Sequence, residues 1–134
     1  MNVLCVARCI HAFLPGMLQR GRGHVVNTAS TAGLWGYSPD RIPYAASKAA
    51  VNHMTVLLAK VVGPEVRVNA VAPGLVDTPW TEDWDVVREV VRQVAPLKRS
   101  GQPEDVADMI LSLSGAAYVT GQVLVVDGGL SIAT

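Results

Sequence analysis

The start of the chain carries hydrophobic side chains at helical spacing. Val3, Val6 and Ile10 are three and four positions apart. This is the periodicity of one helix face, so the sequence predicts a helix over 2–19. Pro15 falls inside that segment, and we expect it to bend the helix near its end.

Short valine-rich runs alternate with further helical segments along the rest of the chain. The runs predict strands over 24–29, 66–71 and 122–126. The periodic segments between them predict helices over 43–62, 85–94 and 103–114. Because valine-rich strands separated by helices form parallel sheets covered on both faces, we expect an α/β fold with about three parallel strands.

Each predicted strand is followed by a polar or glycine-rich segment, at 28–30, 73–78 and 127–129. In open α/β sheets, ligands bind beyond the carboxyl ends of the strands. We therefore expect these three segments to form a ligand site. A sheet of three strands would also leave one edge unpaired.

The composition fits one compact domain over residues 1–134. Half of the chain is hydrophobic, 16% is charged and the formal net charge is zero. The scattered Lys and Arg residues give no basic footprint for nucleic acid or a membrane surface, and no run reads as a membrane span. Cys5 and Cys9, with only His11 nearby, are too few for a metal site. We expect two reduced thiols in a core or interface and a cytoplasmic protein.

The pattern with the most chemical content is Tyr44 followed one helical turn later by Lys48. On a helix the two side chains share a face. An ammonium close to a phenol favours the phenolate, and such a pair can exchange a proton with an alcohol or carbonyl oxygen. The spacing by itself is weak evidence, because a tyrosine and a lysine four apart on a helix usually belong to a solvated or packed face.

The flanking strands give the pair a context. The predicted strand upstream ends in 27–30, and the following loop could return Ser30 beside the first turn of the tyrosine helix. Its hydroxyl could then hydrogen-bond the same substrate oxygen. The spacing leaves Thr31 as a rival for that role. Downstream, 67–78 combines a valine-rich strand with a Pro-Gly turn.

Taken in order, these segments resemble a classical short-chain dehydrogenase/reductase, and the resemblance covers nearly the whole chain. The matching segments are Asn2-Val3, Asn27 to Ser30, Tyr44 to Lys48, Arg67 to Thr78, Tyr118 to Gln122 and Val126 to Gly129. The resemblance is to the C-terminal, catalytic half of that family. It implies a Rossmann-like, doubly wound parallel sheet and an enzyme that moves a hydride between a nicotinamide cofactor and an alcohol or carbonyl carbon.

The resemblance also implies a role for each matching position. Tyr44 would be the general acid or base, and Lys48 would lower the tyrosine pKa and bind the nicotinamide ribose. Ser30 would hold the substrate oxygen, and Asn2 would keep a kink and a water in a proton relay. The residues that would line the nicotinamide, with Tyr44 and Lys48, are Pro73, Gly74, Val76 and Thr78.

Several of these residues have a purely structural alternative. Asn2 could be a helix N-cap, Thr78 could cap the following segment, and Pro73-Gly74 could be only a turn. Three tryptophans lie in or near the loops that flank the predicted site, at 35, 80 and 84. They could line a pocket for a hydrophobic alcohol or ketone, or they could shield the core.

The sequence departs from the family in one respect. No glycine-rich turn leads from a strand into a helix, and that turn is where the family holds the cofactor pyrophosphate. On the order of 100 residues of the family's strand-helix units are without a counterpart. The residue that selects NAD or NADP belongs to that part, so the cofactor is NAD or NADP without further assignment.

Two hypotheses follow. The first is a normal oxidoreductase of which this chain is the catalytic part, with a small alcohol or carbonyl substrate. The second is an inactive fragment or pseudo-enzyme that serves as an oligomerisation module. In both cases the resemblance implies a homo-oligomer, either a dimer or a tetramer.

The missing turn gives a testable expectation for the segment 1–134 by itself. We expect it to bind neither NAD nor NADP at micromolar concentration, because nothing in it holds the pyrophosphate. We also expect poor solubility or self-association, because one sheet edge would be unpaired. Calorimetric titration with each dinucleotide, alongside sedimentation, measures both. Micromolar binding by a soluble monomer would contradict the expectation.

Overall fold

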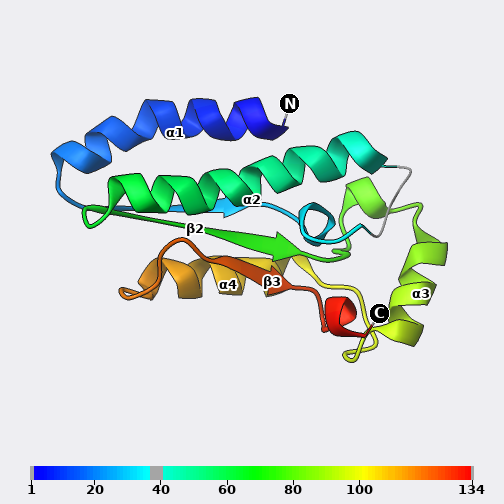
Figure 1. The fold of residues 1–134 in the computed structure, drawn as a ribbon. Helices are drawn as coiled ribbons and strands as arrows, with labels where there is room; N and C mark the ends of the chain where they lie inside the picture. The colour runs from blue at the N-terminus through cyan, green and yellow to red at the C-terminus, as the bar shows by residue number, and fades with distance from the viewer. Residues whose placement is uncertain (1, 37–40, 134) are drawn as a thin grey trace.

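A computed structural model describes residues 2–36 and 41–133. Its helices and strands follow the predicted order (Figure 1). They are α1 (Asn2–Gln19), β1 (Gly23–Thr28), α2 (Ile42–Val62), β2 (Val66–Pro73), α3 (Asp85–Val94), α4 (Pro103–Gly115) and β3 (Val123–Val126). Short 3₁₀ turns, which the periodicity did not predict, lie at η1 (Thr31–Gly33), η3 (Pro79–Thr81) and η4 (Leu130–Ile132).

The strands form a parallel sheet in the order β1-β2-β3. Gly23 pairs with Val66 in the first ladder, and Ala70 pairs with Val123 in the second. β2 continues to Pro73, beyond the predicted end at 71, because its last residues pair with β3. The predicted α/β class with about three parallel strands is confirmed.

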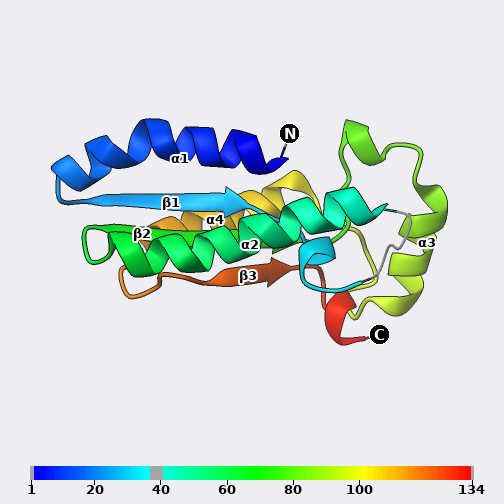
Figure 2. The same cartoon turned by 45° about the horizontal axis from the view of Figure 1, so that its top comes forward.

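Helices cover both faces of this sheet, as a doubly wound arrangement requires. α1 and α2 lie on one face and α4 on the other (Figures 1 and 2). α3 lies beyond the carboxyl ends of the strands, at the right of both views. α1 runs through Pro15 to Gln19 as a single helix.

The core is centred on β2, where five consecutive residues after the first two positions are buried. Val66 and Val68 pack with Val62 of α2, while Ala70 packs with Ala29 and Val51. Both clusters join α2 to the sheet. The buried core consists mainly of valine and alanine side chains.

Two polar side chains of β2 connect the sheet to the chain before β3. The amide of Asn69, which is fully buried, donates to the carbonyl of Val119 and accepts from the N–H of Gln122. The guanidinium of Arg67 donates to the carbonyls of Ser114 and Ala116 at the end of α4. These bonds satisfy helix-end carbonyls that would otherwise lack partners.

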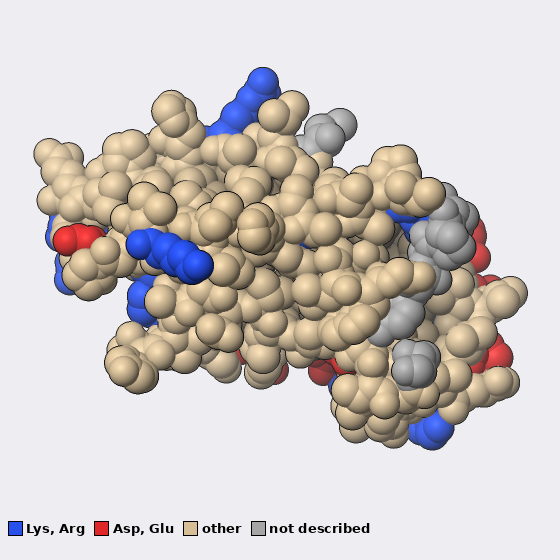
Figure 3. Space-filling view, viewed as in Figure 1, with Lys and Arg blue, Asp and Glu red and all other residues tan. Residues whose placement is uncertain are grey.

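The outer surface of α1 and α2 is apolar. Charged side chains are sparse on the face seen in Figure 3. Its exposed apolar residues include Leu4, Phe13, Ile42, Leu57 and Val61. Cys5 and Cys9 of α1 are also exposed free thiols, so the expectation of thiols buried in a core does not hold within this chain.

The described residues contain no helix that is long and apolar enough to cross a membrane. They also contain no group of His, Cys, Asp and Glu side chains that could hold a metal ion.

The packing of α2 predicts a contrast between two identical substitutions. Val51 is 0% exposed and Val61 is 80% exposed on the same helix. We expect Val51→Ala to lower the free energy of unfolding by about 2 kcal/mol, because it leaves a cavity against Ala29 and Ala70. Val61→Ala should change it by less than about 0.5 kcal/mol. Denaturant unfolding measures both, and equal losses would contradict this account of the core.

Candidate active site

A cavity of about 810 Å³ opens at the carboxyl ends of the strands. Its lining joins the end of β1, the first turns of α2 and the segment after β2. Seven of the eight site residues predicted from the sequence lie on it: Ser30, Tyr44, Lys48, Pro73, Gly74, Val76 and Thr78. The parallel strands produce this convergence because their carboxyl ends share one edge of the sheet.

The end of β1 supplies Ser30 and Thr31, and their hydrogen bonds differ. The hydroxyl of Thr31 donates to the carbonyl of Pro73 at 3.2 Å, so its proton is already in a hydrogen bond within the protein. The Ser30 oxygen accepts from the N–H of Ala32 at 3.2 Å and caps η1. Its own proton stays available for a ligand oxygen. The geometry therefore favours Ser30 over Thr31 as a donor into the cavity.

Gly33 allows η1 to lie directly against α2. A Cβ at this position would lie 2.5 Å from the backbone N of Ala49 and the backbone C of Lys48. Only a residue without a side chain permits this approach, because backbone atoms cannot move aside singly. The glycine thus fixes the distance between the Ser30 segment and the helix that carries Lys48.

Tyr44 and Lys48 come from the first turns of α2, which begins at Ile42. The Lys48 Nζ donates to the carbonyl of Thr28 at 2.9 Å and lies 5.8 Å from the centroid of the Tyr44 ring. Burial lowers the pKa of the Lys48 ammonium from its usual value. Among the described residues no carboxylate pairs with it. Within residues 2–36 and 41–133, its charge therefore acts on the cavity without a paired carboxylate.

The segment after β2 passes under the cavity and is held on both sides. A Cβ at Gly74 would lie 2.7 Å from the Cβ of Asp127, so the glycine lets this turn pack against the segment after β3. Val76 forms a bridge with Gly101. Thr78 lies at the N-cap position of η3, and its N–H donates to the Thr81 hydroxyl at 3.0 Å.

Asn2 is the predicted site residue that the structure does not bring to the cavity lining. Its side-chain amide donates to the Ser47 hydroxyl at 3.0 Å, and that hydroxyl donates to the carbonyl of Tyr44. Asn2 thus ties α1 to the turn of α2 that carries Tyr44. A role in a proton relay stays a prediction.

Aromatic and valine side chains form the outer wall of the cavity. The ring of Tyr44 lies 5.7 Å from that of Trp80, which in turn lies 5.2 Å from Trp84. Both indoles line the cavity, whereas Trp35 is absent from the lining among the described residues. α3 contributes Val86, Val87, Val90, Val91 and Val94. The sequence reasoning missed these valines, although their spacing along one helix stripe was a usable signal.

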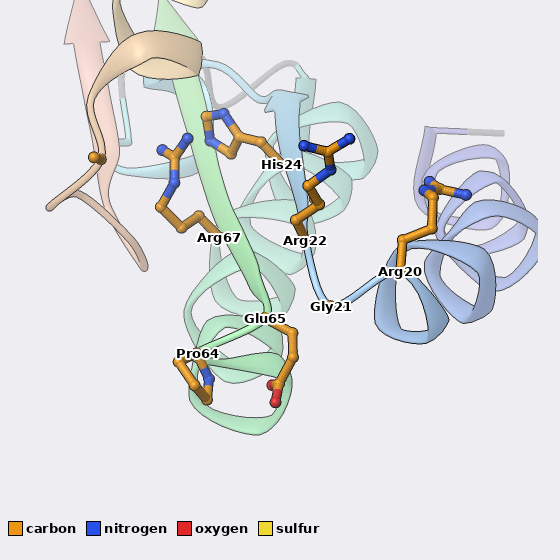
Figure 4. A pocket seen from close by; sticks show the side chains of 9 residues that line it. Arg20, Gly21, Arg22, His24, Pro64, Glu65 and Arg67 are labelled. Atoms are coloured by element: carbon orange, nitrogen blue, oxygen red, sulfur yellow. The ribbon is translucent and has the colours of Figure 1, made fainter.

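A second cavity, of about 550 Å³, lies at the opposite ends of the strands (Figure 4). Its lining is basic and includes Arg20, Arg22 and Arg67. The Arg67 guanidinium already donates to carbonyls at the end of α4. The burial of His24 and the nearby charge of Arg67 lower the pKa of that histidine. None of the predicted catalytic residues reaches this end, so the candidate active site is the first cavity.

Comparison with known proteins agrees with the geometry. A sequence model of a family described as enoyl-(acyl carrier protein) reductase matches residues 1–131. The chain belongs to the short-chain dehydrogenase/reductase family. The resemblance inferred from the motifs is therefore confirmed.

Individual members of the short-chain dehydrogenase/reductase family show how much of the fold is present. A 3-oxoacyl-[acyl-carrier-protein] reductase FabG from Thermotoga maritima is 43% identical over 136 residues, which are 98% of this chain and 55% of that protein. A crystal structure of a 3-oxoacyl-[acyl-carrier protein] reductase with bound NAD from Brucella melitensis superposes with a TM-score of 0.87 at 41% identity. It covers 96% of this chain and 48% of that one. The chain thus spans about half the length of these relatives.

Another relative is about as long as this chain. The short-chain dehydrogenase/reductase homolog YusR from Bacillus subtilis is 37% identical over 127 residues, which are 92% of this chain and 95% of that protein. The oligomerisation-module alternative gains no support from these relatives, because the two longer ones are named as reductases.

The close contact at Gly33 gives a prediction for the site. We expect Gly33→Ala to push η1 away from α2 and to lower the free energy of unfolding by about 1–3 kcal/mol, the usual cost of overpacking. Gly36→Ala is the matched control, because a Cβ there meets no atom within 4 Å. Thermal unfolding of the two variants measures the difference. If Gly33→Ala is as stable as the control, Gly33 does not set the spacing.

Proposed function

We propose that the chain carries the catalytic part of an NAD(P)-dependent oxidoreductase that interconverts an alcohol and a carbonyl compound. The observation that carries this proposal is the convergence of Ser30, Tyr44 and Lys48 on one cavity at the carboxyl ends of the strands. A hydrogen-bond donor, a phenol and an ammonium suit proton transfer at a substrate oxygen. Membership of a family of reductases supports the same reaction class.

In this proposal Tyr44 and Ser30 act on the substrate oxygen, and Lys48 acts on Tyr44. In the reducing direction Tyr44 donates its phenolic proton to the carbonyl oxygen, and Ser30 donates a hydrogen bond to that same oxygen. Lys48 stabilises the phenolate that remains. In the oxidising direction Tyr44 takes the alcohol proton back.

The residues beside this group fit a nicotinamide. Pro73, Gly74, Val76 and Thr78 line the cavity next to Tyr44 and Lys48, and Gly74 keeps the turn tight against Asp127. When bound, NAD or NADP supplies or accepts the hydride. Lys48 would bind the ribose hydroxyls, and the segment 73–78 would hold the carboxamide face. The Brucella relative holds NAD, and the phosphate state for this chain stays open.

The substrate is proposed to have an apolar body beside its reactive carbon. Trp80, Trp84 and the α3 valines give the cavity a mostly apolar wall. The 3-oxoacyl reductases among the relatives are named for such substrates. Burial of that wall by a matching apolar group would stabilise the complex by the hydrophobic effect.

The setting proposed for the enzyme is a cytoplasmic homo-oligomer, a dimer or a tetramer. The exposed apolar residues of α1 and α2, such as Phe13 and Leu57, support association because monomers rarely expose contiguous apolar surface. Cys5 and Cys9 are free thiols, which fits a reducing compartment.

The central test removes the phenolic oxygen. In the full-length product of the gene, Tyr44→Phe should lower kcat by at least about 10²-fold, the usual factor for a lost acid-base group. Cofactor affinity should change little, because the ring stays in place. NADH and NADPH oxidation with a panel of ketones and 3-oxoacyl thioesters measures turnover, and calorimetry measures cofactor affinity.

Tyr118→Phe is the matched control, since Tyr118 is fully exposed and absent from the cavity lining. It should retain wild-type turnover. If Tyr44→Phe keeps more than about a tenth of the rate, Tyr44 is not the acid-base group. If the wild-type product oxidises neither dinucleotide with any substrate of the panel, the oxidoreductase proposal fails.

A further inference from the structure

The carboxylate of Asp77 joins two helices of the cavity to the segment after β2. One of its oxygens accepts from the Arg88 Nε at 2.8 Å, and Arg88 belongs to α3. The other accepts from the Gln102 side-chain amide at 3.0 Å, immediately before α4. The N–H of Asp77 also donates to the carbonyl of Gly101. Both carboxylate oxygens are therefore used to connect elements.

The guanidinium of Arg88 extends these connections around the turn that carries Trp80. One terminal nitrogen donates to the carbonyl of Thr81 at 2.6 Å. The other donates to the carbonyl of Glu82 at 2.9 Å and to the Asp85 carboxylate at 3.1 Å. A planar fork with five N–H donors suits this task, which the single ammonium of a lysine could not perform.

The elements held in this way form the outer wall of the cavity, and several of their side chains face solvent. Trp80 is 63% exposed and Val86 of α3 is 79% exposed. Trp80 nevertheless lies 5.7 Å from the ring of Tyr44, between that residue and Trp84. Since so much of their surface faces solvent, burial in the core does little to fix these side chains. The polar bonds of Asp77 and Arg88 therefore add to the anchoring that the buried Val91 of α3 provides.

We propose that Asp77, Arg88 and Gln102 are positioning residues that hold η3 and α3 over the cavity and thereby set selectivity for the apolar part of the substrate. This inference rests on the proposed function as far as selectivity is concerned. None of the three is assigned contact with the reacting atoms. Their effect passes through Trp80, Trp84 and the α3 valines.

The proposal predicts a change in selectivity with little change in global stability. Partly exposed ion pairs contribute little to the free energy of unfolding. The bonds that Arg88 makes are local to 77–85, so their loss should loosen the wall while the buried sheet stays intact. A residue with a merely structural role would instead lower stability and affect all substrates alike.

The first measurement compares Arg88→Gln with Arg92→Gln in the full-length product of the gene. Arg92 lies one turn further along α3 and pairs only with the exposed Glu89 at 3.1 Å among the described residues, so it is the matched control. Two ketones with the same reactive group are used, one with a short and one with a long apolar tail. For Arg88→Gln we expect KM to rise at least tenfold for the long ketone and less than threefold for the short one. The kcat for the short ketone should stay within threefold of the control.

The second measurement does not depend on activity. Acrylamide quenching of tryptophan fluorescence is recorded in a common Trp35→Phe background, in which Trp80 and Trp84 are the tryptophans left within residues 1–134. Any tryptophan outside this segment is replaced by Phe in the same background. Arg88→Gln should raise the quenching constant at least twofold over Arg92→Gln while the melting temperature stays close to that of the control. If Arg88→Gln fails to fold, Asp77→Asn tests the same wall, since it keeps the side-chain shape but loses the charge that binds both partners.

The outcomes separate this proposal from the proposed function. Unchanged quenching together with an equal change in KM for both ketones overturns the positioning role. If the wild-type product shows no turnover at all, the oxidoreductase proposal fails, and the quenching result alone then decides whether Asp77 and Arg88 hold the wall.

Discussion

The burial of β2 is the constraint on which the rest of the structure depends. It pairs with a strand on each side and is covered by helices on both faces, so most of its side chains are fully enclosed. A strand in this position has its direction and register fixed by two ladders at once. Its carboxyl end therefore emerges at one defined point, and Pro73 and Gly74 begin the cavity there.

The sequence was sufficient to predict most of the fold. The spacing of its hydrophobic residues and the positions of its glycines and prolines indicate the same helices and strands. Valine runs with a glycine or proline at one end located all three strands, and the helix boundaries at 85 and 94 were predicted without error. The end of β2 was predicted too early, because its last pairs depend on β3, which lies about fifty residues away and has no local signal at that point. The 3₁₀ turns were missed for a related reason, since they are too short to show a period.

The sequence could predict site residues whose chemical type suits a reaction. It could not predict those that matter only through their position in the folded chain. Tyr44 and Lys48 were predicted as site residues because a phenol and an ammonium one turn apart have a chemical use, and both line the cavity. The choice between Ser30 and Thr31 needed coordinates, because both are hydroxyls and only the bond from Thr31 to the Pro73 carbonyl distinguishes them. The network of Asp77 and Arg88 joins residues from separate elements, and no spacing rule relates them.

The two sides of the cavity are secured by different kinds of interaction. The side that carries Ser30 and Lys48 is attached to the buried sheet and to the backbone contact at Gly33, where substitutions are costly. The opposite side is held by hydrogen bonds near the surface, where single substitutions usually cost little. Such a division means that substitutions on the outer helix can reshape one wall of the cavity while the wall built on the sheet keeps its geometry.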